Sequence, residues 1–207
     1  MGLVYKKIFK GDSILGLWEI SESVRELLSV VDLSTSDLEV LSKKINDKRK
    51  KEWLSTRCLV KNLLEKPVAI TYGEHGNPLL ENGEYHISIS HSENYSVVLL
   101  NKSKPVGIDI QRIKPNIGKG IDYFLNNQEQ IWVDETDFIL LNILWSCKES
   151  IFKYVASHEL NIRNQIFCNS FEPQSEGVVE VIIRNENHET LMIHYEVFED
   201  YVLTRTL

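Results

Sequence analysis

The stretch from Phe138 to Val155 constrains the fold of this chain more than any other. Its apolar residues recur at intervals of three and four positions without a Gly or Pro between them, which predicts a helix with one broad buried face. Glu149 lies on or beside that face, because it follows Trp145 by four residues and precedes Phe152 by three. A carboxylate in this position needs a partner. The partner is either Lys153, in an ordinary surface ion pair one turn along the helix, or a group bound at a site.

Length and composition fit a globular protein with one large domain or two small ones. The chain has 207 residues, of which 43% are hydrophobic and 26% charged. No apolar run is long enough to cross a membrane, and the first residues contain no signal-peptide core, so we expect a cytoplasmic protein. The net charge of −7 argues against nucleic-acid binding in bulk. Because Cys58, Cys147 and Cys168 are widely spaced and odd in number, we expect free buried thiols rather than disulfides or a zinc site.

The most basic part of the chain runs from Lys43 to Lys61. Its lysines and arginines are interleaved with apolar residues such as Trp53, which predicts one amphipathic helix. The basic edge of that helix is either an ordinary solvated face or a surface that holds phosphate groups. On the second interpretation, Arg49 and Arg57 are the residues that we expect to contact a phosphate.

Two predicted strands flank a polar loop in the middle of the chain. Residues 85–90 alternate apolar and polar side chains, and residues 96–100 form a continuous apolar run. His91 and several short polar side chains lie in the loop that joins these strands. The loop is either a plain hairpin turn or a set of polar groups available to a ligand at a strand end.

The stretch from Val106 to Gln111 is a predicted strand with an unusual residue in its centre. Alternation places Gly107, Asp109 and Gln111 on one face and three apolar residues on the other. Asp is poorly suited to the middle of a strand. We interpret Asp109 as a metal ligand, with Gly107 removing bulk so that a ligand can approach. The alternative is an Asp that ends the strand at a bend.

The remaining pattern indicates an α+β protein. We expect strands at residues 4–9 and 14–20, a helix at 22–31, a further helix capped by Ser36 with Glu39, and carboxyl-terminal strands at 177–184, 189–197 and 201–206 with a turn at 185–188. Asn126 and Glu129 have capping-box spacing, so a helical stretch is expected to begin there as well. The two halves have comparable length and similar elements, which predicts two α+β lobes, residues 1–104 and 105–207.

Five blocks of sequence stand out when they are taken together. The blocks are Gly76–Pro78, Ile87–Ser92, Val106–Gln111, Asn126–Glu129 and Trp145–Lys153. Their order and spacing resemble those of the 4′-phosphopantetheinyl transferase superfamily in its longer, Sfp-like form. The resemblance extends from about Lys48 to Phe171, and the third and fifth blocks are hard to match by chance.

The resemblance implies a fold and an activity. The fold is a pair of α+β lobes related by a pseudo-twofold axis, with coenzyme A (CoA) bound in the cleft between them. The activity transfers the 4′-phosphopantetheine arm of CoA to a serine of an acyl or peptidyl carrier protein and releases 3′,5′-ADP. The carriers of such enzymes serve fatty-acid, polyketide or nonribosomal peptide synthesis. We therefore expect a cytoplasmic monomer that needs Mg²⁺ and binds neither nucleic acid nor membrane.

The resemblance also implies roles for residues of this chain. Asp109 and Glu149 would hold Mg²⁺ against the pyrophosphate of CoA, with Gln111 in a third ligand position. Glu149 and Lys153 are expected to be catalytic, and Glu129 is the expected base for the serine proton. The residues expected to contact CoA are Arg49, Arg57, Asn77, Ser90, His91, Lys148 and Lys153.

Two residues depart from the pattern of the family. Gln111 stands where an acidic residue is usual, and Asn77 stands where a lysine is common. The first change weakens a metal ligand, and the second removes a positive charge from the phosphate site. The alternative function is therefore a catalytically weakened homologue that works as a module binding CoA or a carrier protein.

Overall fold

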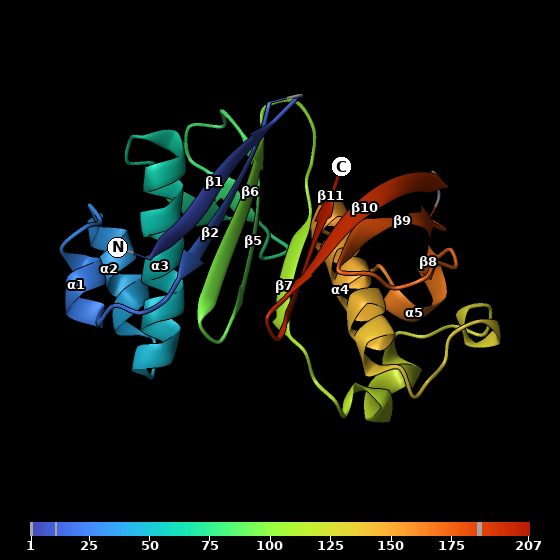
Figure 1. Ribbon diagram of the computed structural model, residues 1–207. Helices are drawn as coiled ribbons and strands as arrows, with labels where there is room; N and C mark the ends of the chain where they lie inside the picture. The colour runs from blue at the N-terminus through green and yellow to red at the C-terminus, as the bar shows by residue number, and fades with distance from the viewer. Residues whose placement is uncertain (1, 11, 186–187) are drawn as a thin grey trace. The chain divides into compact units, whose positions relative to one another are not determined.

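Helices and antiparallel sheets make up both halves of the chain, which divides into two units, Met1–Lys104 and Pro105–Leu207 (Figure 1). The computed structural model describes residues 2–10, 12–185 and 188–207. Each unit contains strands, helices and its own hydrophobic core, so the predicted α+β class is confirmed. Within the described residues, no helix is both long enough and apolar enough to cross a membrane.

In the first unit, helices pack against an antiparallel sheet with the strand order β1-β2-β6-β5. The strands of this sheet are β1 (Leu3–Phe9), β2 (Ser13–Glu19), β5 (His86–Ser92) and β6 (Tyr95–Asn101), and β3 (Ile70–Tyr72) pairs separately with β4 (Pro78–Leu80). The helices are α1 (Val24–Leu28), α2 (Thr35–Ser42) and α3 (Asp47–Leu64). Helix α3 forms most of the predicted basic helix, but Lys43 and Lys44 lie before it, just after the end of α2. It packs on β2 and β6 (Figure 1), and its buried face supplies much of the core.

Helix α2 has a different cap from the predicted one. Oγ of Ser34, not of Ser36, accepts a hydrogen bond from the backbone N–H of Asp37, and the carboxylate of Asp37 accepts one from the backbone N–H of Ser34. The predicted pair of Ser36 and Glu39 is therefore wrong. The same spacing of a serine and an acidic residue occurs twice in overlapping positions, and only the structure shows which pair caps the helix.

In the second unit, helix α4 packs against a sheet with the strand order β7-β11-β10-β9-β8 (Figure 1). The strands are β7 (Ile108–Arg112), β8 (Ile166–Cys168), β9 (Glu176–Ile183), β10 (Glu189–Phe198) and β11 (Tyr201–Thr206). The helices are α4 (Phe138–Val155) and α5 (Ile162–Gln165), with 3-10 turns η1 (Ile117–Tyr123) and η2 (Glu129–Ile131). Strands β9 to β11 form the expected antiparallel meander. Of the turn expected at 185–188, residues 186 and 187 lie outside the described residues.

Helix α4 has the predicted bounds. Asp137 caps its first turn by accepting a hydrogen bond from the backbone N–H of Leu140, and Ala156 ends it in the left-handed conformation, with a φ of 52°. The predicted apolar face, which includes Leu144 and Ile151, is buried against the sheet in the core of the unit. Hydrophobic burial of this face therefore fixes which side of α4 meets the strands.

The backbone of α4 lies very close to Gly107, the residue just before β7. A Cβ atom on Gly107 would lie 1.9 Å from the backbone oxygen of Ser150, so a larger residue requires the helix to move. The backbone N–H of Gly107 donates to Oγ1 of Thr206 at 3.1 Å. We expected the missing side chain of Gly107 to leave room for a ligand. That expectation is wrong, because α4 occupies the space.

Polar side chains continue this contact along β7 and α4. Asp109 accepts a hydrogen bond from Oγ of Ser146 at 2.8 Å, and Nε2 of Gln111 donates to the backbone oxygen of Asn142 at 2.9 Å. Two residues of a strand advance by about 6.7 Å and four residues of a helix by about 6 Å, so the two elements stay in register. The buried residues along this line, which we call the polar seam, are Gly107, Asp109, Gln111, Asn142, Ser146 and Ser150.

Gly107→Ala is expected to destabilise the protein by about 1–3 kcal/mol, the usual cost of overpacking a core. The physical reason is overlap between the added methyl group and the backbone oxygen of Ser150. Gly118→Ala is the matched control, because a Cβ atom there meets nothing closer than 3.6 Å. Urea unfolding of both variants measures the difference. Wild-type stability of Gly107→Ala would show that α4 does not make this contact in solution.

Candidate functional site

Asp109 is held between two donors from helix α4. Nζ of Lys153 lies 2.7 Å from Oδ1 of Asp109, and Oγ of Ser146 donates to Oδ2. The side chain of Asp109 is buried, whereas that of Lys153 is 27% exposed. Solvent therefore reaches this ion pair, at the polar seam, from the Lys153 side. Strand β7 continues past Asp109 to Arg112, which excludes the alternative of an Asp that ends the strand.

Glu149 lies near this pair without a hydrogen-bond donor of its own. Among the residues that the structure describes, none donates a hydrogen bond to its half-buried carboxylate. Burial raises the pKa of Glu149, the negative charge of Asp109 raises it further, and the positive charge of Lys153 opposes both. Lys153 forms its ion pair with Asp109, in place of the surface pair with Glu149 that was the alternative.

The two carboxylates fit a divalent cation that prefers oxygen ligands. Mg²⁺ in proteins is commonly bound by one or two carboxylates together with water and phosphate oxygens. A cation beside Asp109 and Glu149 would relieve the repulsion that raises the pKa of Glu149. Across the described parts of the chain, no three His, Cys, Asp or Glu side chains are grouped so as to hold a metal. The pair would therefore need further ligands from a substrate or from water.

Gln111 shares a face of β7 with Asp109, but its amide nitrogen is engaged with α4. Nε2 of Gln111 donates to the backbone oxygen of Asn142 at 2.9 Å and to Oδ1 of the same residue at 3.3 Å. Asn142 in turn donates to the backbone oxygens of Lys114 and Phe138. Only the amide oxygen of Gln111 is left for a metal, and its role as a third ligand stays a prediction.

The amino group of Lys148 points into the core of the second unit. Nζ donates to the backbone oxygen of Phe124 at 2.6 Å, to Oε2 of Glu129 at 2.7 Å and to the backbone oxygen of Ile166 at 2.8 Å. An ammonium group has three hydrogens, so all of its donors are used. The side chain is 0% exposed. The expectation that Lys148 contacts a phosphate of CoA is therefore wrong in this structure.

Glu129, the expected base, is enclosed in the same cluster. Besides Lys148, Oε2 accepts from the backbone N–H of Asn126 at 3.0 Å, and Oε1 accepts from the backbone N–H of Cys168 at 2.8 Å. Oδ1 of Asn126 accepts from the backbone N–H of Glu129, which completes the expected capping box, but only the short turn η2 follows. A base must reach the proton that it accepts, and a carboxylate that is 1% exposed does not. The structure thus corrects the role of Glu129 to a structural one.

Two residues expected to contact CoA meet at an acidic residue in the first unit. Nη1 of Arg49 lies 3.0 Å from Oε2 of Glu52, and Nδ1 of His91 lies 3.7 Å from the same oxygen. Glu52 is buried, whereas the side chain of Arg49 is 63% exposed and that of His91 is 38% exposed. Sequence reasoning missed Glu52, although its place one turn after Arg49 is a signal for such a pair. Ser90 precedes His91 in β5 and is buried.

The other two candidates of the first unit differ in exposure. Asn77 is half-buried in the turn between β3 and β4, where its backbone oxygen accepts from the N–H of Gly73. The guanidinium of Arg57 lies over the ring of Trp53, 3.2 Å from its centroid, and pairs with Asp37 at 3.2 Å. Arg57 is buried and ties α2 to α3, so the interpretation of Arg57 as a phosphate ligand is corrected. Arg49 is the arginine that remains for that role.

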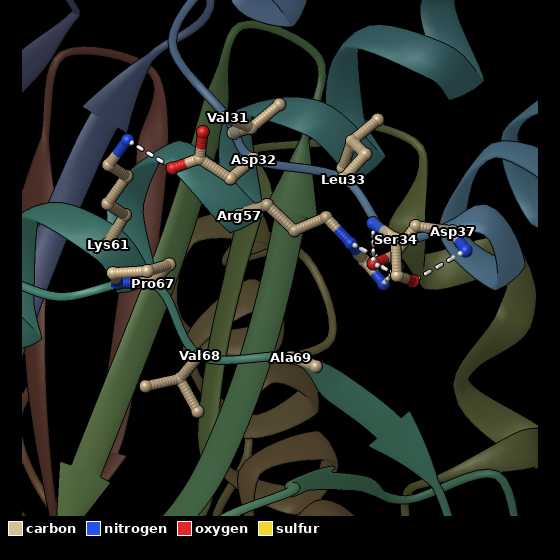
Figure 2. A pocket seen from close by; sticks show the side chains of 10 residues that line it. All are labelled: Val31, Asp32, Leu33, Ser34, Asp37, Arg57, Lys61, Pro67, Val68 and Ala69. Atoms are coloured by element: carbon tan, nitrogen blue, oxygen red, sulfur yellow. Dashed lines mark hydrogen bonds and ion pairs between the residues drawn. The ribbon is translucent and has the colours of Figure 1, made fainter.

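Arg57 also lines a pocket of the first unit, which Figure 2 shows from close by. The residues around it are Val31, Asp32, Leu33, Ser34, Asp37, Arg57, Lys61, Pro67, Val68 and Ala69. Each cation in the pocket has a carboxylate partner: Arg57 pairs with Asp37, and Lys61 pairs with Asp32 at 2.9 Å. The charges within the pocket therefore balance.

The three cysteines are free and buried, as predicted. Burial raises the pKa of the Cys58 thiol to about 12, and it raises the pKa values of Cys147 and Cys168 as well. Thiols with raised pKa values are poor nucleophiles because little thiolate is present at neutral pH. Their role in this chain is packing.

Removal of either charge from the pair of Lys148 and Glu129 is expected to destabilise the protein strongly. Lys148→Met leaves a buried carboxylate without its cation, and Glu129→Gln leaves a buried ammonium without its anion, so each should cost about 3–5 kcal/mol. The double variant should recover part of that loss. Urea unfolding measures all three, and a loss below about 1 kcal/mol for both single variants would place Lys148 in solvent.

Glu149→Gln is expected to raise the melting temperature at neutral pH. Because folding raises the pKa of Glu149, the folded chain binds this proton more tightly than the unfolded chain does. Wild-type stability therefore falls as pH rises from the ordinary pKa of Glu through the raised value. The variant lacks this titration, so it should melt a few degrees higher at neutral pH and no higher in acid.

Melting curves across this pH range provide the measurement. Glu159→Gln changes an exposed glutamate of the same unit and should behave as the wild type does. A neutral-pH melting temperature of Glu149→Gln at or below that of the wild type would contradict the unfavourable charge at this position.

Comparison with known proteins shows which family the sequence of the second unit resembles. Residues 105–206 match the model of the 4′-phosphopantetheinyl transferase superfamily. The chain is 29% identical over 147 residues to the 4′-phosphopantetheinyl transferase gsp of Aneurinibacillus migulanus, covering 69% of this chain and 59% of that protein. It is also 29% identical over 146 residues to a 4′-phosphopantetheinyl transferase of Bacillus subtilis, covering 66% of this chain and 62% of that protein. The chain thus spans about three fifths of the length of these relatives. Residues 105–206, nearly all of the second unit, are thus similar to the 4′-phosphopantetheinyl transferase superfamily, and both relatives carry the name of that activity.

Proposed function

We propose that this chain transfers the 4′-phosphopantetheine arm of CoA to a serine of an acyl or peptidyl carrier protein in a reaction that depends on Mg²⁺. The observation that carries the proposal is the convergence of Asp109, Glu149 and Lys153 within the residues that match the family. The names of the two relatives support the same reaction. The proposal names an acyl or peptidyl carrier protein and does not choose between fatty-acid, polyketide and peptide synthesis.

The proposed reaction breaks the phosphoanhydride bond of CoA and forms a phosphate ester bond on the carrier. The serine oxygen of the carrier bonds to the phosphorus next to the pantetheine arm, and the bond from that phosphorus to the bridging oxygen breaks. The electron pair leaves with 3′,5′-ADP, and the serine proton passes to water. The nucleophile comes from the partner, so the chain itself needs no nucleophilic serine or cysteine.

The residues of the second unit would neutralise charge at the pyrophosphate. Asp109 and Glu149 would hold Mg²⁺, which when bound supplies positive charge beside the phosphate oxygens. Lys153 is partly exposed and adds a second cation one turn after Glu149. Ser146 and Lys153 keep the carboxylate of Asp109 in one orientation before any substrate arrives. Such preorganisation avoids the cost of reorienting charged groups during the reaction.

The first unit would contribute contacts to CoA. Arg49 and His91 are partly exposed and lie around one buried carboxylate, that of Glu52, so a phosphate could be met by two cationic side chains when His91 is protonated. Ser90 and Asn77 are further candidates from the same unit. Lys148, Glu129 and Arg57 are not assigned to substrate contacts.

The decisive experiment incubates the purified chain with CoA, Mg²⁺ and several apo carrier proteins and weighs the carriers. At least one carrier should gain the mass of one phosphopantetheine arm. Asp109→Asn should reduce the rate by about 100-fold or more, because loss of even an indirect metal partner costs about 10- to 100-fold. Asn keeps the size of the side chain that Ser146 and Lys153 contact, so the fold should persist.

Asp200→Asn is the control for this substitution, since Asp200 is a half-exposed partner of Arg112 at the surface of the same unit. It should transfer at the wild-type rate. If carriers that are competent substrates for another transferase gain no mass with the wild-type chain, the proposed transfer is wrong. Binding of CoA or carrier in that case would favour the alternative of a binding module.

A further inference from the structure

Hydroxyl groups behind Asp109 form a connected chain in the second unit. Thr204 lies opposite Asp109 in the pairing of β7 with β11, so both side chains project from the same face of the sheet. Oγ1 of Thr204 lies 3.0 Å from Oγ of Ser146 and 2.6 Å from Oγ of Ser150. The three residues are 0% exposed, so water does not compete for these hydroxyl groups.

The donors and acceptors along this chain have one consistent direction. An ionised carboxylate only accepts hydrogen bonds, so the single hydroxyl hydrogen of Ser146 goes to Oδ2 of Asp109. Thr204 donates to the backbone oxygen of Ser146 at 2.8 Å, and Oγ of Ser146, 3.0 Å from the same hydroxyl, is a second acceptor for that hydrogen. Because the Thr204 hydrogen is used toward Ser146, the hydroxyl of Ser150 is the donor across the 2.6 Å to Oγ1 of Thr204, and the same hydroxyl lies 3.1 Å from the backbone oxygen of Thr204. Hydrogen bonds in such a series polarise one another, which strengthens the last bond, the one to the carboxylate.

We propose that Ser146 is a positioning residue for the metal site and that Thr204 holds the Ser146 hydroxyl in the required orientation. The hydrogen bond from Ser146 fixes Oδ2 of Asp109 and turns Oδ1, which pairs with the ammonium of Lys153, toward positive charge, so Oδ1 is the oxygen that a metal would approach. The inference rests on the proposed function for the presence of a divalent metal. It does not depend on the transfer reaction itself.

The spacing of the polar seam explains why these particular residues have this role. Ser146 is placed opposite Asp109 by the same register that brings Ser150 to Gly107. Glu149 follows Ser146 by three residues, on a neighbouring part of the helix surface, so one turn of α4 carries both the positioning hydroxyl and the second carboxylate. Partners behind a metal ligand typically contribute about 10- to 100-fold to metal affinity.

The test measures Mn²⁺ binding to the full chain by calorimetry, with Mn²⁺ alone as the probe. Ser146→Ala should bind Mn²⁺ about 10- to 100-fold more weakly than the wild type. Ser55→Ala is the matched control: Ser55 is also fully buried in a helix, and its Oγ lies 2.7 Å from that of Ser96 in the first unit. It loses an equivalent hydroxyl far from Asp109 in the hydrogen-bond network and should bind Mn²⁺ as the wild type does.

A second pair of variants separates positioning from packing. Thr204→Val keeps the shape of the side chain and removes the hydroxyl, so it should weaken Mn²⁺ binding several-fold. Thr204→Ser keeps the hydroxyl and should retain wild-type affinity. In the transfer assay, Ser146→Ala should need a higher Mg²⁺ concentration for half-maximal rate, with an unchanged KM for CoA. A packing role alone would lower the melting temperature without moving either metal response.

Three outcomes would overturn the inference: wild-type Mn²⁺ affinity in Ser146→Ala, equal losses in Thr204→Ser and Thr204→Val, or no Mn²⁺ binding by the wild type. The transfer assay distinguishes these from a failure of the proposed function. A wild-type chain that binds Mn²⁺ in a manner dependent on Ser146, yet modifies no carrier, would contradict the transferase and support the positioning role.

Discussion

The contact between Gly107 and the backbone of α4 is the constraint on which the second unit depends. The carbonyl of Ser150 lies against a residue that has no side chain, so α4 comes closer to the start of β7 than any larger residue would allow. Ser146 then meets Asp109, because four residues of helix match two residues of strand. Lys153 follows Ser146 by seven residues on the same side of α4 and reaches the same carboxylate. The geometry of the candidate site is thus a consequence of backbone packing.

The buried pair of Lys148 and Glu129 supports this arrangement from the other side of the helix. Adjacent residues of a helix point about 100° apart, so Lys148 faces the core while Glu149 lies near Asp109. Lys148 binds the backbone oxygen of Phe124, the residue after η1, and that of Ile166 in β8 as well as Glu129, which joins three segments to α4. A buried ion pair is weak grounds for stability, but an unpaired member is strongly unfavourable. Separation of these segments would leave a buried charge unpaired, so the ion pair disfavours such structures.

Periodicity could predict α4, most strands and the unusual positions of Asp109 and Glu149, because each is a property of one element. It could not predict the acceptors of Lys148, which are contributed by segments far away in the sequence. Its burial did have a local signal: Lys148 shares a face with Leu144 and Ile151, four residues before and three after. The family resemblance implied a phosphate contact for Lys148. The position of Lys148 on the apolar face of the helix predicted its burial correctly.

The two carboxylates of the candidate site differ in their hydrogen bonds and in the charges around them. Asp109 has its charge compensated by Lys153 and its orientation fixed by Ser146, both from helix α4. Glu149 has no hydrogen-bond donor among the described residues, and the positive charge of Lys153 only partly offsets the burial and the charge of Asp109 that raise its pKa. Carboxylate ligands must lose their protons to bind a metal, so a cation at the proposed site would compete with a proton at Glu149. The unfavourable charge of Glu149 is consistent with a residue placed for binding, since a core selected for stability alone would have no reason to retain it.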